Sequence, residues 1–196
     1  WEGEKLSKKQ ANELSGIDNI YYIEDFKAVL SSIATKVDTF YINKNEHYRA
    51  NSPVETREDR FISWLLKKYP AHNVAKSNPI LQRQRSIKHP HEIDQIKRAC
   101  DITRKGFNRV LKYIKPDVWE YEIEAEFIHE FINSSSKGFA YSPIIASGND
   151  NNVLHYIKNN KQCKSGELIL MDVGAEYGNY SSDMTRTIPV SGKFSK

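Results

Sequence analysis

The feature that most constrains the fold is a change in hydrophobic periodicity at Gly138. From Pro90 onward the chain carries two amphipathic helical patterns, over 90–114 and about 118–133, separated by a Lys-Pro-Asp break. After Gly138 the pattern becomes that of strands, over 141–146, 167–176 and 179–190. This part of the chain is therefore expected to combine two helices with a sheet.

The first part of the chain has a mixed α/β pattern. Short aromatic and β-branched runs predict strands at 19–23 and 38–42, and apolar spacing predicts helices at 24–33 and 55–69. The polar stretch 77–89 follows, and we interpret it as a linker and domain boundary. Its basic group QRQRSIK is of a kind that can contact nucleic acid, but such groups more often mark a solvated linker. We expect no nucleic-acid partner.

The composition excludes several classes of protein. The chain has 196 residues, of which 39% are hydrophobic, and no window resembles a membrane span or a signal peptide. The two cysteines lie far apart without metal-type spacing, which favours reduced thiols and a cytoplasmic location. The first residue is Trp1 rather than Met, so we expect the chain to start inside a longer gene product.

Two aspartates between Met171 and Pro189 form the main candidate site. Asp172 stands inside an apolar strand, where an unpaired acid costs free energy, and Asp183 lies in the returning strand. A two-residue hairpin loop at Gly178-Asn179 or at Tyr177-Gly178 puts both acids on one face of the sheet. The first register makes them diagonal neighbours. The second sets them directly opposite, with Cβ atoms roughly 5 Å apart.

Two carboxylates this close repel each other, so one would stay protonated unless a cation lies between them. Oxygen ligands suit Mn, Mg or Ca, and two metal ions roughly 3.5–4 Å apart can stabilise a hydrolytic transition state. Two other arrangements stay open from spacing alone. The acids could pair with Lys or Arg on an exposed hairpin, or an odd-length loop or a bulge could place them on opposite faces.

One of the six histidines is a candidate catalytic group. His155 follows the small polar loop SGNDNN at the end of a strand, and loops at strand ends often carry functional groups. Its imidazole could donate a hydrogen bond to a substrate carbonyl or to the developing oxyanion. A single histidine is nevertheless more often structural. The other five lie in surface-like or helical surroundings and are read as ordinary.

Five short motifs follow one another in a fixed order: Ile145–Asn149, His155-Tyr156, Gly166–Leu168, Met171–Ala175, and Tyr180 with Asp183–Thr187. This ordered set resembles the aminopeptidase P group of pita-bread metallopeptidases, whose fold is shared by creatinase, prolidase and methionine aminopeptidase. The resemblance covers nearly the whole chain. It implies part of a creatinase-like N-terminal α/β domain over 1–84 and the first half of a pita-bread catalytic domain over 90–196.

The resemblance also implies a reaction and a set of site residues. The reaction is removal of an N-terminal residue that precedes proline, with two divalent metal ions, commonly Mn. Asp172 and Asp183 match two aspartate ligands of the family. His155 matches the histidine that contacts substrate near the scissile bond, although Leu154 stands where many relatives have proline. Many relatives form dimers, so a homodimer is expected of the parent protein.

The main departure from the family pattern lies after Asp183, where the chain reads MTRTIPVSGKFSK. The family requires one more His and two Glu downstream, so three of five ligands are absent from this chain. We therefore expect the chain alone to have little or no peptidase activity. The alternative function is a pita-bread relative that binds peptides or proteins without catalysis, and a dipeptide or creatine substrate also stays open.

Overall fold

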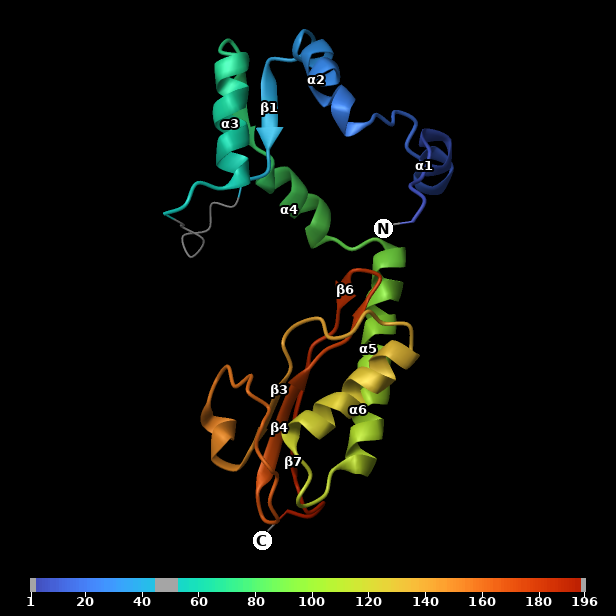
Figure 1. Cartoon of the computed structure of the whole chain (residues 1–196), viewed down its shortest axis with the longest axis vertical. Coiled ribbons are helices and arrows are strands. Elements are labelled where there is room, and N and C mark those ends of the chain that lie inside the picture. The colour runs from blue at the N-terminus through green and yellow to red at the C-terminus, as the bar shows by residue number, and fades with distance from the viewer. Residues whose placement is uncertain (1–2, 45–52, 195–196) are drawn as a thin grey trace. The chain divides into compact units, whose positions relative to one another are not determined.

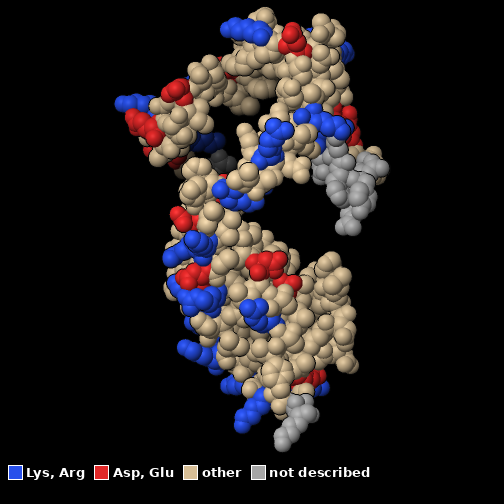
Figure 2. Space-filling view, turned by 180° about the vertical axis from the view of Figure 1, so that it is seen from behind, with Lys and Arg blue, Asp and Glu red and all other residues tan. Residues whose placement is uncertain are grey.

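The computed structural model describes residues 3–44 and 53–194 and divides the chain into two units, 1–87 and 88–196 (Figure 1). The mixed α/β fold expected from the sequence is confirmed. On the face drawn in Figure 2, Lys and Arg side chains are interspersed with Asp and Glu over the second unit. No helix in the described ranges has a stretch apolar and long enough to cross a membrane.

The first unit is built around a parallel pair of strands. Strand β1 (Thr39–Ile42) and strand β2 (Asn73–Lys76) pair in register, and helix α3 (Arg57–Lys68) connects them along the chain. Helix α2 (Phe26–Ala34) precedes β1, and Ala34, Phe40 and Leu65 form the buried centre. The remaining elements of this unit are α1 (Lys8–Ser15), the 3-10 turn η1 (Ile23–Asp25) and α4 (Asn78–Ser86).

Two expectations for the first unit are wrong. The run 19–22 forms no strand, and residue 23 opens η1. Aromatic and β-branched residues favour strands only where a neighbouring strand pairs with them, and no described strand does so here. The stretch 77–89 is not an open linker, because most of it is helix α4. Pro79 lies in the first turn of that helix, where a missing N–H costs nothing.

The second unit packs two helices on one face of an antiparallel sheet. Helices α5 (Pro90–Tyr113) and α6 (Glu120–Asn133) precede strands β3 (Ile144–Ser147), β4 (Leu168–Val173) and β7 (Met184–Pro189). The sheet order is β3-β4-β7, with β4 in the centre. The core joins helix residues to alternate residues of β4 and contains Ile102, Phe107, Val110, Ile123, Phe127, Phe131, Ile169, Met171 and Val173.

The helix patterns in the second unit are confirmed, with a rotated apolar face on α5. Thr103, Phe107 and Val110 are buried as the spacing predicts. Cys100 has the same three- and four-residue spacing to its neighbours, which predicts burial, but it is exposed, and the buried face instead includes Ala99, Ile102 and Gly106. The small residues Ala99 and Gly106 let the helix approach its neighbours closely. The spacing of large apolar residues in the sequence does not predict such close packing.

Candidate functional site

Asp172 lies on the face of the sheet that the helices do not cover. Along β4, Ile169, Met171 and Val173 are fully buried toward the helices, so the alternation of a strand turns Asp172 to the opposite face. Asp172 pairs with Ile144 on β3 and with Thr185 on β7. It is therefore held in the centre of the sheet, partly exposed.

Asp183 lies just before β7, in a break that interrupts the expected long strands. The two segments 167–176 and 179–190 each divide into two short strands, adding β5 (Glu176–Tyr177) and β6 (Tyr180–Ser181). A side chain at Gly174 would place its Cβ 1.9 Å from the carbonyl oxygen of Ser182, so only glycine permits this backbone approach. The sequence did not predict this break.

Two buried hydroxyl groups hold the same break from the side of the helices. The backbone N–H of Ala175 donates to Thr103 Oγ1 at 2.9 Å and to Ser182 Oγ at 3.0 Å. The two hydroxyl oxygens are 2.6 Å apart. Thr103 of α5 therefore holds Ser182, the residue immediately before Asp183. In this way it also fixes the backbone from which the Asp183 side chain projects.

The hairpin turn selects the diagonal register for the two acids. Gly178 and Asn179 both have positive φ angles, 58° and 66°, as a two-residue type I′ turn requires. Tyr177 consequently pairs with Tyr180, and Asp172 pairs with Thr185 rather than with Asp183. Of the two registers considered, the one with the Gly178-Asn179 loop is confirmed, and the directly opposed pairing is wrong.

The two acids nevertheless converge on one side chain. The hydroxyl group of Tyr141 lies 2.7 Å from Asp172 Oδ1 and 3.1 Å from Asp183 Oδ1. The two carboxylate oxygens are therefore no further apart than the sum of these two hydrogen bonds. Burial, and then the hydrogen bonds and charges of both aspartates, raise the pKa of Tyr141 far above its ordinary value, so the phenol stays a donor.

Nothing cationic in the described ranges neutralises this acid pair. None of the described Lys or Arg residues makes an ion pair with Asp172 or Asp183. The alternative in which the two acids pair with Lys or Arg on an exposed hairpin is therefore not found in the described ranges. One hydroxyl proton cannot balance two negative charges. Carboxylate oxygens are the ligands that Mn and Mg prefer, so the two side chains fit part of a metal site. Within 3–44 and 53–194, no group of three or more possible metal ligands occurs.

His155 lies in the connection between β3 and β4, after the 3-10 turn η3 (Gly148–Asn152). Its side chain is exposed, as are its neighbours Val153, Leu154 and Ile157. Among the hydrogen bonds and ion pairs of the described residues, none links His155 to either acid. Its proposed role in catalysis stays a prediction.

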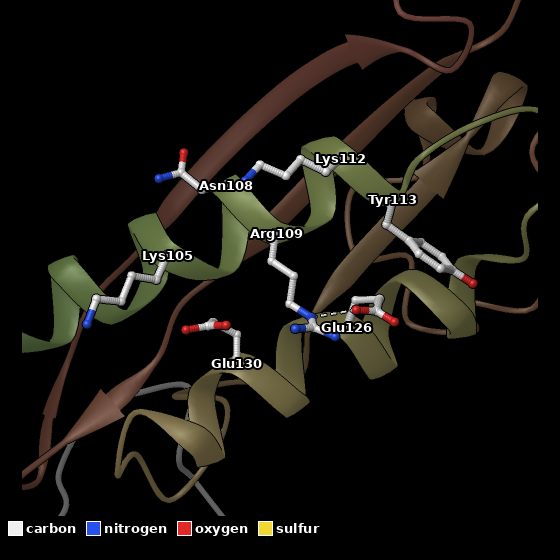
Figure 3. A pocket seen from close by; sticks show the side chains of 7 residues that line it. All are labelled: Lys105, Asn108, Arg109, Lys112, Tyr113, Glu126 and Glu130. Carbon is white, nitrogen blue, oxygen red and sulfur yellow. Dashed lines mark hydrogen bonds and ion pairs between the residues drawn. The ribbon is translucent and has the colours of Figure 1, made fainter.

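A pocket of about 510 Å³ lies elsewhere in this unit, between α5 and α6 (Figure 3). It is lined by Lys105, Asn108, Arg109, Lys112, Tyr113, Glu126 and Glu130. Arg109 forms an ion pair with Glu126 across it. None of the three predicted site residues lines this pocket, which separates it from the acid pair.

Sequence reasoning missed Tyr141 and Glu120. The predicted strand 141–146 gives Tyr141 no role, because its contact with Asp172 joins residues far apart in the chain. Glu120 is one of the acids in the first turn of α6, where acids are common on exposed helices, yet it is fully buried. A signal did exist at each position. Tyr141 lies shortly before the motif Ile145–Asn149. Glu120 opens α6, and its spacing to the next buried residue, Ile123, places it on the buried face of the helix.

Comparison with known proteins identifies the class of protein to which this site belongs. The model of metallopeptidase family M24 matches residues 94–196. The Xaa-Pro aminopeptidase of Haemophilus influenzae is 31% identical over 199 residues, which cover 100% of this chain and 43% of the relative. The Escherichia coli Xaa-Pro aminopeptidase is 30% identical over 202 residues, covering 100% and 45%. The chain thus spans less than half the length of these relatives.

Solved structures agree with these relatives. A Bacillus anthracis protein provisionally named an aminopeptidase P has a TM-score of 0.92 at 33% identity, covering 100% of this chain and 46% of that one. Zinc-substituted Escherichia coli aminopeptidase P in complex with product has a TM-score of 0.87 at 29% identity, with 100% and 45% coverage. The chain belongs to metallopeptidase family M24, a family of metal-dependent enzymes, and within it to the aminopeptidase P group.

Proposed function

We propose that this chain supplies part of the catalytic site of a proline-specific aminopeptidase, which releases the N-terminal residue from peptides with proline in second position. The observation that carries the proposal is the convergence of Asp172 and Asp183 on the Tyr141 hydroxyl, without a cationic partner in the described ranges. Family membership supports the reaction class. The relatives named Xaa-Pro aminopeptidase support the substrate.

In this proposal Asp172 and Asp183 are two ligands of a pair of divalent ions, with Mn as the expected metal. When bound, such ions supply Lewis-acid activation of water and of the scissile carbonyl. Tyr141 donates to a carboxylate oxygen and thereby orients it, as partners of metal ligands commonly do. His155, exposed on its loop, donates a hydrogen bond to the substrate near the scissile bond.

The proposal extends to the domains and to the parent protein. Residues 1–84 are part of a creatinase-like N-terminal domain, and residues 90–196 are the first half of a pita-bread domain. A homodimeric parent in the cytoplasm completes this picture, and the free thiols of Cys100 and Cys163 agree with a reducing compartment. The two acids alone give the chain little or no peptidase activity.

Manganese binding tests the metal part of the proposal directly. Two carboxylates should bind Mn²⁺ weakly, with a Kd of about 0.1–1 mM. Water-proton relaxation of Mn²⁺ solutions should show this binding in the wild-type chain and its loss in the double variant Asp172→Asn, Asp183→Asn. The matched control is Asp117→Asn, an exposed acid whose φ of 73° suits asparagine. Equal Mn²⁺ binding by the double variant and the control would show that Asp172 and Asp183 are not the metal ligands.

The runner-up function is a peptide- or protein-binding module without catalysis. It requires no metal ligand beyond the described ranges, in which no group of three or more possible ligands occurs. The two functions differ in their metal dependence. A binding module should hold a proline-containing peptide equally well with Mn²⁺ and with a chelator, whereas the proposed enzyme site should hold it better with Mn²⁺.

A further inference from the structure

Glu120, the first residue of α6, is the only fully buried acidic residue in the described ranges. Its carboxylate accepts four hydrogen bonds. Oε1 accepts from the backbone N–H and from the hydroxyl of Ser147, both at 2.8 Å. Oε2 accepts from the hydroxyl of Tyr156 at 2.7 Å and from the backbone N–H of Lys161 at 3.0 Å. Hydrogen bonds to a carboxylate are stronger than those between neutral groups.

The donors to this carboxylate lie along one connection of the chain, the segment 147–161 between β3 and β4. Ser147 is the last residue of β3, Tyr156 lies in the middle, and Lys161 lies at the far end. The backbone N–H of Glu120 also donates to the carbonyl oxygen of Lys161 at 2.9 Å. One residue of α6 therefore holds the two ends and the middle of the segment.

The middle contact bears on His155, which is the next residue to Tyr156. Tyr156 is only 7% exposed, whereas the adjacent side chain of His155 is exposed. Burial and the Glu120 carboxylate raise the pKa of Tyr156 to about 12, so its hydroxyl remains a donor. The anchored tyrosine fixes the backbone from which the histidine projects.

We infer that Glu120 is the positioning residue for His155: its buried carboxylate ties the 147–161 segment to α6 and so sets the place from which the imidazole meets substrate. The substrate role of His155 rests on the function proposed above, whereas the tethering of the segment does not. Glu120 itself touches neither acid of the candidate metal site in the described contacts.

A carboxylate is needed at this point because all four partners are donors. The amide of glutamine could still accept from Ser147 through its oxygen. Its NH₂ group would then face the hydroxyl of Tyr156, which can rotate, and the N–H of Lys161, which cannot. Glu120→Gln thus leaves a buried donor unpaired while keeping the size and shape of the side chain.

The experiment uses the chain as it stands, with Glu120→Gln and with Tyr156→Phe, which removes only the hydroxyl contact. Glu130→Gln, near the other end of α6, is the control. In Glu120→Gln we expect amide exchange over 148–160 to be about tenfold faster or more, with exchange in β7 unchanged. The His155 ring signals should gain nanosecond mobility. Tyr156→Phe should give the same gain in His155 ring mobility, and a smaller increase in amide exchange elsewhere in the segment.

The same samples separate tethering from substrate contact. A proline-second tripeptide with Mn²⁺ should shift the His155 ring signals of the wild-type chain, and Glu120→Gln should weaken that response about tenfold. Absence of a shift in the wild type would count against the proposed function. The exchange and His155 mobility measurements would then still decide whether Glu120 holds the segment. The inference is overturned if folded Glu120→Gln keeps wild-type exchange and His155 order. If that variant does not fold, unchanged His155 order in Tyr156→Phe overturns it.

Discussion

The hydroxyl group of Tyr141 is shared between Asp172 and Asp183, at 2.7 Å and 3.1 Å. Replacement of Tyr141 by Phe removes this donor and keeps the ring. We expect the change to lower the free energy of unfolding by about 1–2 kcal/mol in chelator, because two close carboxylates then lack their hydrogen-bond partner. The loss should shrink when Mn²⁺ is present, since a bound cation stabilises both carboxylates whether or not the hydroxyl donates to them.

Urea unfolding of wild type and Tyr141→Phe, in chelator and in Mn²⁺, checks this expectation. Tyr121→Phe is the control, because Tyr121 is 50% exposed and is stacked on Trp119 instead. It should cost little under either condition. A Tyr141→Phe deficit that is the same size with and without Mn²⁺ would mean that the acids do not share a cation.

Gly174 permits the close approach of two backbone segments beside the acid pair. Gly174→Ala would put a Cβ atom 1.9 Å from a backbone oxygen of Ser182, which no rotamer change can relieve. We expect it to lower the free energy of unfolding by about 3 kcal/mol. Gly166→Ala provides the comparison, because Gly166 has a φ of 84° and open space around it. Backbone strain alone should cost about 1 kcal/mol there. Equal losses in the two variants would contradict the close-approach explanation.

The features that the sequence predicted are those set by neighbouring residues. The Gly178-Asn179 turn follows from two residues that tolerate positive φ, and the buried face of α6 follows from apolar spacing. The features that it missed depend on pairing across the fold. Tyr141 meets Asp172 only because its chain segment runs beside β4, and Glu120 finds its donors between Ser147 and Lys161. The spacing of Glu120 to Ile123 marks the buried face of α6, but no local pattern marks the partners that Tyr141 and Glu120 meet.

The hydroxyl groups of Thr103 and Ser182 act on the same backbone N–H, that of Ala175. Thr103→Val and Ser182→Ala should each lower the free energy of unfolding by about 1–2 kcal/mol. Because the two groups share partners, their effects should be non-additive by about 0.5 kcal/mol or more. A double-mutant cycle measures this coupling. Combining Thr103→Val with Ser31→Ala, in the other unit, should give additive effects.

Asp59, in the first turn of α3, provides a pH dependence that is separate from the acid pair. A hydrogen bond from Lys44, followed by hydrogen bonds from Thr56, lowers the pKa of Asp59 from 3.8 to about 2. The folded state therefore binds this proton less readily than the unfolded chain does. It follows that the carboxylate stabilises the first unit fully above its unfolded pKa, and that this stabilisation disappears as the pH falls from about 4 toward 2.

Denaturant unfolding followed through the indole signal of Trp64, which packs against the core of the first unit, measures this dependence between pH 2 and pH 6. The wild-type midpoint should fall across that window, and Asp59→Asn should flatten the fall. Glu58→Gln, an acid in the same turn, should retain the wild-type slope because it leaves the Lys44–Asp59 ion pair in place. If Asp59→Asn loses stability with acid as steeply as the wild type, another carboxylate governs the acid sensitivity of this unit.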